Sequence, residues 1–326
     1  MLLVRSPLRI SLGGGGTDLP SYYREFGSSF VSAAIDKYVY VTVSQPFEDS
    51  IVAKYSKYEK VSKVEQIQHP ILRETLKIIC PEIKKIEVAA FADIPAGTGL
   101  GSSGSFGTAL VKALNLFLHR SIAPKDIAEL AISIESGILE EPTGKQDQYI
   151  AAFGGISQFT ISQDGQVEVN PLKISSQTLH SLETNLCLFY TGKSREASQL
   201  LSDQDKRSKF KDAVILRDLE AIKMIGMQSK IALEDSNLTL FAELLNEHWQ
   251  IKKHRSNGMS NNFIDQVYES ARKNGAIGGK LVGAGGGGFL MFYTEEPARL
   301  RTNMENLNMR ELRFGFDFEG TKVVLS

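Results

Sequence analysis

The chain has 326 residues, of which 42% are hydrophobic and 23% charged, and 37 basic against 38 acidic residues give a net charge of −1. This balance is typical of a globular protein with one large domain or two ordinary ones. The absence of excess basic charge argues against nucleic acid or an anionic membrane surface as a partner. No apolar run approaches the ~20 residues of a membrane-spanning helix.

Strand and helix signals alternate along the first half. Period-two alternation predicts a strand over 38–43, and a second strand over 85–91 runs into a glycine-rich segment. Apolar residues at helical spacing predict a helix after this segment and another from Pro124 onward. A hairpin over 154–172 indicates a seam, so we expect an N-terminal domain of residues 1–172 and a C-terminal domain of residues 173–326.

The second half begins with a predicted strand over 186–190, followed by long helical stretches to about Trp249. Two apolar strands, 280–282 and 289–293, are joined by a second glycine-rich segment, 283–288. Cys80 and Cys187 are the only cysteines. They form no Cys-x-x-Cys pair, which argues against a disulfide framework or a cysteine zinc site and favours a cytoplasmic location.

The glycine-rich segment between the strand over 85–91 and the following helix predicts a phosphate-binding loop. Its glycines allow successive backbone N–H groups to face one concavity, and the helix N-terminus adds partial positive charge. A merely tight turn would need fewer glycines. No Lys follows the last glycine as in a P-loop, and a dinucleotide site would need a second parallel strand after the helix. The candidate residues are Pro95, Gly97, Gly99, Leu100, Gly101, Ser102, Ser103, Gly104 and Ser105.

Four consecutive glycines, 13–16, precede Thr17 and Asp18 near the N-terminus. Such a run brings the backbone close to a bulky group, and a carboxylate can accept two hydrogen bonds from sugar hydroxyls. The segment is either a polyol-binding loop or a flexible turn.

Two carboxylates lie downstream of the phosphate-binding loop. Glu135 borders the apolar face of the helix that begins at Pro124, where an unpaired carboxylate is costly, so it needs a cation. That cation is either a basic side chain or, if the loop holds ATP, Mg²⁺. Asp147 follows Pro-Thr-Gly at 142–144, and we expect it in a loop. It is either a turn residue or a carboxylate that orients or deprotonates an acceptor hydroxyl.

Three segments together resemble the GHMP kinase superfamily. Residues 5–14 look like its first motif, residues 95–103 match its signature P-x-G-x-G-L-G-S-S, and residues 280–289 look like its third motif. The resemblance implies an α+β fold of two domains, with nucleotide and substrate in the cleft between them. It also implies that ATP and Mg²⁺ are cofactors and that a small sugar or sugar phosphate is the partner, in a monomer or homodimer.

Family roles can be carried over position by position. The resemblance implies that backbone N–H groups of 97–105 hold the ATP phosphates, with Ser103 and Glu135 as Mg²⁺ ligands. It implies that Asp147 is the catalytic carboxylate with Arg9 beside it. The implied substrate contacts are Gly16, Thr17, Asp18, Arg195, Gly285 and Gly286. Two departures stand out: Gly104 replaces the usual Ala, and glycines 13–16 replace the galactokinase Ile-Gly-Glu-His run.

Within the superfamily, the N-terminal motif, the segment 190–195 and the C-terminal glycine run are similar to kinases that phosphorylate the anomeric O1 of D-glycero-D-manno-heptose 7-phosphate. The substrate's own phosphate would need cations, for which Arg195, Lys193 and the cluster 252–255 are candidates; the cluster is otherwise a solvated helix end. The alternatives are a kinase for fucose, galactose or an N-acetylhexosamine, a non-catalytic ATP and sugar sensor, and an NAD-dependent enzyme.

Overall fold

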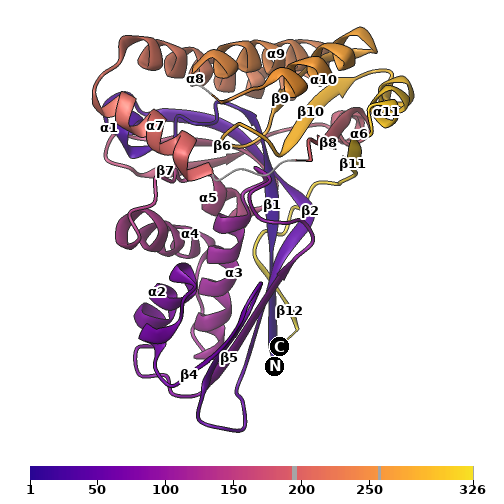
Figure 1. The fold of residues 1–326 in the computed structure, drawn as a ribbon. Coiled ribbons are helices and arrows are strands. Elements are labelled where there is room, and N and C mark those ends of the chain that lie inside the picture. Colours follow the sequence, from indigo (N-terminus) through magenta and orange to yellow (C-terminus); the bar gives the residue numbers. More distant parts are fainter. Residues whose placement is uncertain (193–196, 256–257, 326) are drawn as a thin grey trace.

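Two long antiparallel strands, β1 (Leu2–Gly13) and β2 (Ser28–Ser44), form the spine of the structure, a computed structural model that describes residues 1–192, 197–255 and 258–325. The two strands pair from Leu2 with Val43 to Gly13 with Val31. β2 is much longer than the strand predicted over 38–43, because its first residues, 28–33, pair with β6. Figure 1 shows the pair running from the lower part of the molecule into the upper part.

The first sheet has the order β12-β1-β2-β5-β3-β4, with β6 on the other half of β2 and β7 beside it. Only the β3–β5 pair is parallel. The strands and helices of this part are β3 (Ile51–Lys54), β4 (Tyr58–Val61), β5 (Ile86–Ala92), β6 (Ile156–Ile161), β7 (Val167–Pro171), β12 (Lys322–Leu325), α1 (Pro20–Phe26), the 3₁₀ turn η1 (Val64–Gln66), α2 (Pro70–Ile79), α3 (Ser102–Phe117), α4 (Pro124–Ile132), the π-helical segment η2 (Ser133–Ile138) and α5 (Gln146–Phe153).

Helices α2, α3, α4 and α5 cover one face of the first sheet (Figure 1). The apolar stripe of α3 is buried as its helical spacing predicts, with Ala109, Leu110, Ala113 and Leu114 fully inaccessible to solvent. These side chains join those of β1 and β2 in the core of this part. This packing fixes the N-terminus of α3, and with it the glycine-rich loop, against the sheet.

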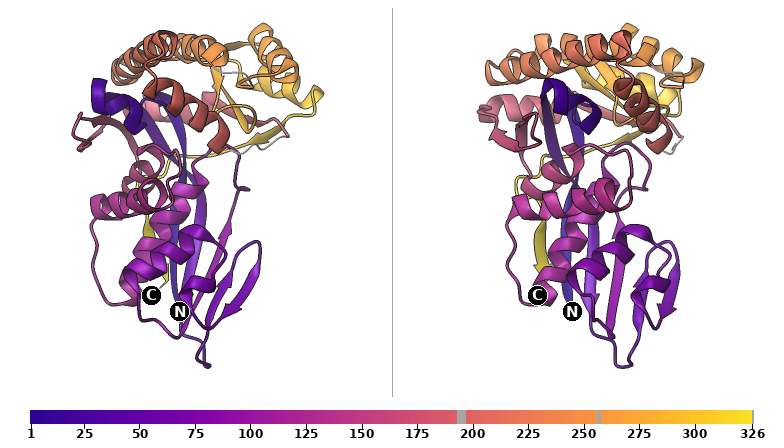
Figure 2. Two further views of the ribbon diagram at one scale, coloured as in Figure 1. Left: turned by 60° about the vertical axis from the view of Figure 1, so that its left-hand side comes forward. Right: turned by 90° about the vertical axis from the view of Figure 1, so that its left-hand side faces the viewer.

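The second part is a four-stranded antiparallel sheet of order β11-β8-β10-β9. Its elements are α6 (Ser176–Asn185), β8 (Leu186–Tyr190), α7 (Ala197–Lys209), α8 (Ala213–Glu234), α9 (Leu238–Arg255), α10 (Asn262–Lys273), β9 (Ala276–Leu281), β10 (Phe289–Thr294), α11 (Pro297–Asn306) and β11 (Arg310–Leu312). Helix α9 lies directly on β9: a Cβ added at Gly278 would sit 1.7 Å from the Ala242 carbonyl oxygen. Figure 2 shows α8 to α10 stacked at one end of the molecule.

A second apolar core joins the two parts. Leu8, Ile10 and Leu12 of β1 pack with Phe241 of α9 and Met291 of β10. The α+β, two-domain prediction is confirmed. The boundary at residue 172 stays a proposal, and the C-terminal strand crosses it, because β12 pairs with β1 in the first sheet. No helix in the described part of the chain is long and apolar enough to span a membrane.

Candidate active site

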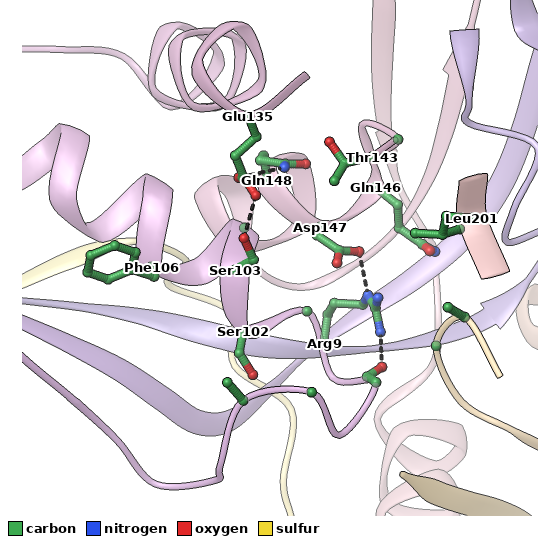
Figure 3. A pocket seen from close by; sticks show the side chains of 18 of the residues that line it. Arg9, Ser102, Ser103, Phe106, Glu135, Thr143, Gln146, Asp147, Gln148 and Leu201 are labelled. Carbon is green, nitrogen blue, oxygen red and sulfur yellow. Dashed lines mark hydrogen bonds and ion pairs between the residues drawn. The ribbon is translucent and has the colours of Figure 1, made fainter. Parts of the chain in front are cut away.

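A cavity of about 910 Å³ lies where the two parts meet. One wall is the glycine-rich loop and the start of α3, and another is the segment of residues 15–19 with the start of α5. The C-terminal part contributes residues of α7 and α9 and of the region from Lys280 to Ala284. Figure 3 shows the labelled side chains that line this cavity.

The glycine-rich loop reaches the cavity through its backbone. Gly99 has φ of +84°, and a Cβ there would lie 2.6 Å from the Val282 carbonyl oxygen, so only glycine lets this loop touch the segment after β9. Gly101, in the left-handed conformation, begins α3. The first N–H groups of a helix have no partner within it, and the buried Ser102 hydroxyl has none either. These free donors fit a bound phosphate chain.

Most of the predicted phosphate-loop residues line the cavity, namely Pro95, Gly97, Gly99, Gly101, Ser102, Ser103 and Gly104. Two do not. The Leu100 side chain is buried in the core between the two parts. The Ser105 hydroxyl donates to the Pro7 carbonyl oxygen at 2.7 Å and so holds α3 against β1.

Arg9 and Asp147 form an ion pair at the floor of the cavity. Arg9 Nε donates to Asp147 Oδ1 at 2.8 Å, and its Nη1 donates to the Gly99 carbonyl oxygen at 2.5 Å (Figure 3). Only 6% of Arg9 is exposed. The expectation of Asp147 in a loop is wrong: it lies in the first turn of α5. The helical segment η2 already ends at Ile138, before Pro-Thr-Gly, and α5 begins at Gln146, two residues after Gly144.

Gly104 explains how Asp147 comes so close to the loop. A Cβ at Gly104 would lie 2.7 Å from the Asp147 Cβ, which is closer than real carbon contacts allow. The departure from Ala at this position therefore lets the first turns of α3 and α5 pack directly on one another. This departure from the family motif is thus the place of a close helix–helix contact.

Glu135 lies on η2 with 2% of its surface exposed. Its carboxylate accepts hydrogen bonds from the Ser103 hydroxyl and, at 2.9 Å, from Gln148 Nε2 (Figure 3). Burial raises the pKa of Glu135. Both donors are neutral, so no basic side chain compensates this carboxylate among the interactions of the described residues. A buried carboxylate beside a hydroxyl at a phosphate-binding loop fits Mg²⁺, which takes one or two protein oxygens together with phosphate oxygens.

Only part of the predicted polyol-binding loop lines the cavity. Asp18, 7% exposed, lines the cavity and accepts a hydrogen bond from the Gln146 backbone N–H at 3.0 Å. Burial raises the pKa of Asp18, and the charge of Asp147 adds to the effect. Gly16 also lines the cavity. Thr17 does not: it is fully buried, and its hydroxyl donates to the Gly14 carbonyl oxygen at 2.8 Å. Thr17 therefore holds the loop in shape.

Two other predicted substrate contacts lie away from the cavity. A Cβ at Gly285 would meet the Met259 sulfur at 2.5 Å, and the Gly286 N–H donates to the Met259 carbonyl oxygen at 3.0 Å. Both glycines therefore pack against the segment that precedes α10. Arg195 and Lys193 lie outside the described residues.

Buried basic residues of the C-terminal part line the cavity. Lys252 and Arg255 belong to the cluster that the sequence offered as a candidate for the substrate's phosphate, whereas Lys280 and His248 were missed. Lys252 and Arg255, 6% and 4% exposed, line the cavity, so a solvated helix end is the wrong reading for these two. Lys280, 2% exposed, and His248 also line it, with Lys280 Nζ 3.3 Å from His248 Nδ1. The sequence did hold a signal for Lys280, because this Lys lies inside an apolar strand before the glycine-rich turn. A Lys is rarely buried unless it has a partner, so such a position indicates a site for an anion.

The opposite end of the cavity is aromatic. The His69 ring lies between those of Tyr55 and Phe106, with centroid distances of 4.9 Å to Tyr55 and 5.0 Å to Phe106. The three residues line the cavity together with Phe91. Burial lowers the pKa of His69, which favours a neutral ring. This end can hold a flat apolar group, and Phe106 belongs to the helix that follows the glycine-rich loop.

Comparison with known proteins shows the family of the chain. Residues 67–155 match the family model for the GHMP kinases N terminal domain, and residues 229–308 match that for the GHMP kinases C terminal domain. The D-glycero-alpha-D-manno-heptose 7-phosphate kinase of Campylobacter jejuni is 30% identical over 98% of this chain and 96% of its own length. The L-fucokinase/L-fucose-1-P guanylyltransferase of Bacteroides fragilis is 25% identical over 90% of this chain, which spans 34% of that protein.

A crystal structure described as a D-glycero-D-manno-heptose 1-phosphate kinase from Bacteroides thetaiotaomicron covers 100% of this chain and 99% of its own, with a TM-score of 0.81 and 26% identity. The chain belongs to the GHMP kinase family. It is a phosphotransferase of the sugar kinase type, and the predicted family and enzyme class are confirmed.

The buried Lys280 gives a prediction for the free protein. Burial and the charge of Arg9 lower the pKa of Lys280 from 10.5 to about 7. Between these values the folded protein binds fewer protons than the unfolded chain, so the unfolding free energy rises with pH, by up to ~1.4 kcal/mol per pH unit. Lys280→Met removes the charge, and its gain in unfolding free energy over the wild type should be largest below pH 7 and shrink toward pH 10. His248 and Lys252, which face Lys280 from α9, remain in both proteins.

Denaturant unfolding at pH 6 and pH 9.5 measures this gain. The matched control is Lys84→Met, at an exposed lysine, for which the difference from the wild type should not depend on pH. An equal gain for Lys280→Met at both pH values would contradict the buried charge.

Proposed function

We propose that this protein is an ATP-dependent kinase that phosphorylates the anomeric O1 of D-glycero-D-manno-heptose 7-phosphate, giving the 1,7-bisphosphate for nucleotide-activated heptose biosynthesis. The observation that carries the proposal is the ion pair of Arg9 and Asp147, in which Nε and Oδ1 are 2.8 Å apart. This pair lies beside the N–H groups at the start of α3. It supports the proposal because a carboxylate that could serve an acceptor hydroxyl lies beside N–H groups that suit a phosphate. The two buried free cysteines and the use of ATP agree with action in the cytoplasm.

ATP would lie along the cavity with its base at the aromatic end and its phosphates on the loop. The rings of Tyr55, His69 and Phe106 offer faces and edges for a flat heteroaromatic group. The loop from Gly97 to Gly104 supplies backbone N–H groups and the unpartnered Ser102 hydroxyl. The N-terminus of α3 favours the negative charge of the phosphates.

Ser103 and Glu135 would hold Mg²⁺, which supplies neutralisation of the phosphate charge when it is bound. In the free protein the Ser103 hydroxyl donates to the Glu135 carboxylate, and Gln148 donates to its other oxygen. Gln148 therefore keeps the carboxylate oriented toward Ser103.

Asp147 would orient the acceptor hydroxyl and accept its proton. The acceptor oxygen forms a bond to the γ-phosphorus, the bond from that phosphorus to the β–γ bridging oxygen breaks, and the proton passes to Asp147. The buried Arg9 guanidinium, bonded to Asp147 and to the Gly99 carbonyl, fixes this carboxylate relative to the loop. An anomeric hydroxyl is the most acidic hydroxyl of a sugar, which suits a carboxylate base. Asp18, beside Gln146, would accept hydrogen bonds from other hydroxyls.

One alternative is a kinase for another sugar, which the similarity to an L-fucokinase favours. A substrate screen separates the two: ATP consumption is measured over hexoses and heptoses, each with and without a terminal phosphate, and phosphorus NMR identifies the oxygen modified. We expect the highest kcat/KM for heptose 7-phosphate, with the new phosphate on O1. A higher kcat/KM for fucose or galactose would contradict the proposal. ATP binding without consumption of ATP with any sugar would favour a sensor.

Asp147→Asn should lower kcat by at least about 100-fold while ATP affinity changes little, because the amide keeps the shape of the carboxylate but cannot accept the proton. The matched control is Asp164→Asn in the exposed turn between β6 and β7, which should leave kcat unchanged. Steady-state kinetics and nucleotide titration measure the two effects. Turnover of Asp147→Asn within a few-fold of the wild type would refute the proposed role.

A further inference from the structure

Arg255, the last residue of α9, closes the cavity beyond the glycine segment 13–16. It is 4% exposed, and its Nε and Nη1 atoms have no hydrogen-bond partner among the described residues. Asp218 is the carboxylate that acts on its charge, but Asp218 is ion-paired with Arg217 at 3.1 Å. Burial lowers the pKa of Arg255 to about 10, so its guanidinium is charged at neutral pH. A buried charge with unused donors is unfavourable unless a ligand supplies the acceptors.

Other polar groups of the cavity near Arg255 also have unused hydrogen-bonding atoms. Gly16 has no side chain, and a Cβ there would lie 3.4 Å from Arg255 Nη1. Gln204 of α7 donates to the Gly16 carbonyl oxygen at 2.6 Å, while its buried Oε1 has no partner in the described part of the chain. The same holds for Gln146 Nε2 and Ser11 Oγ, which are buried and belong to residues that line this cavity. Several polar groups therefore face an empty volume together.

The charges of the cavity wall are segregated. The described residues beyond position 200 that line it include Lys252, Arg255 and Lys280 and no carboxylate. Lys252 lies one turn before Arg255 on α9, and its ammonium donates to the carbonyl oxygens of Leu281, at 3.2 Å, and Gly283. The carboxylates that line the cavity, Asp18, Asp93, Glu135 and Asp147, belong to the N-terminal part, as does Arg9. A neutral sugar would gain little from such a cationic wall, whereas a dianionic group would compensate it.

We infer that Arg255, together with Gln204 and Gly16 and within the field of Lys252, forms a subsite for a phosphate group already carried by the acceptor sugar. The inference rests on the proposed function and deepens it. A guanidinium with two free N–H groups can bind two phosphate oxygens at once. The residues of this subsite are not those of the glycine-rich loop that would hold the ATP phosphates. Figure 3 shows Gln146 of α5 and Leu201 of α7 on one side of the Arg9–Asp147 pair, and Ser102 and Ser103 on the other.

The order of the side chains along the cavity indicates at which end of the sugar the phosphate group lies. Asp147 is followed by Gln146, which bonds Asp18, and the segment of Gly15 and Gly16 leads from there to Arg255. A substrate with its reacting hydroxyl at Asp147 therefore reaches Arg255 with its far end. The subsite selects aldoses phosphorylated on the terminal carbon, opposite the anomeric carbon, and rejects sugars whose phosphate is next to the reacting hydroxyl.

The test compares heptose 7-phosphate with the same heptose lacking the phosphate, in the wild type and in Arg255→Met. We expect the wild type to prefer the phosphorylated sugar. Arg255→Met should lower kcat/KM for heptose 7-phosphate by about 100-fold, the loss of charge-assisted hydrogen bonds, and leave kcat/KM for the unphosphorylated heptose and KM for ATP within about twofold. Arg255→Lys, which keeps the charge but not the fork of donors, should fall between the two.

Arg120→Met, at an exposed arginine outside the cavity, is the matched control and should behave as the wild type. Thermal unfolding of each variant reports folding, and Arg255→Lys carries the test if Arg255→Met does not fold. Equal losses for both sugars in either Arg255 variant would overturn the subsite while leaving a sugar kinase in place. No ATP consumption by the wild type with any sugar would instead overturn the proposed function.

Discussion

The ion pair between Arg9 and Asp147 connects the three elements to which we assign the chemistry. Arg9 comes from the long strand β1, Asp147 from the first turn of α5, and the Gly99 carbonyl that Arg9 also binds belongs to the loop before α3. Because Arg9 is nearly inaccessible to water, these bonds are stronger than those of a surface pair. Gly104 completes the arrangement, since any larger residue would push Asp147 away from the loop. The carboxylate is thus set before any ligand binds, which is what a phosphoryl-transfer site requires.

A second constraint is the distribution of charge across the cavity. The N-terminal side carries buried carboxylates, Arg9 and the N–H groups at the start of α3. The C-terminal side carries Lys252, Arg255 and Lys280, and no carboxylate among its described residues lines the cavity. Burial of these cations lowers their pKa values and costs folding free energy. That cost is offset when anionic ligands bind, so the wall that weakens the free protein favours the complex. In the proposed complex, the reacting hydroxyl of the acceptor lies on the side of the carboxylates, and its phosphate lies on the side of the cations.

The sequence predicted those features that depend on local pattern. The strand, glycine loop and helix order around residues 86–117 follows from periodicity and glycine content, and α3 begins within the predicted segment. The helical spacing of apolar residues put Glu135 at the border of a buried helix face, and its side chain is buried in the structure. Asp147 was assigned to a loop because Pro-Thr-Gly ends helices, and nothing local indicates that α5 begins at Gln146. Thr17 was misread because its hydroxyl is buried against the Gly14 carbonyl oxygen and the hydroxyl of Ser28, which lies on β2 and is not adjacent in sequence. The burial of Lys280 and Arg255 depends on packing between the two parts, which no local pattern reveals.

The most direct measurement is a crystal structure with a non-hydrolysable ATP analogue, Mg²⁺ and heptose 7-phosphate. The account predicts the triphosphate on the N–H groups between Gly97 and Gly104, with the anomeric oxygen in hydrogen-bond contact with Asp147 and facing the γ-phosphorus. A triphosphate bound elsewhere, or Asp147 turned away from a bound sugar, would contradict it.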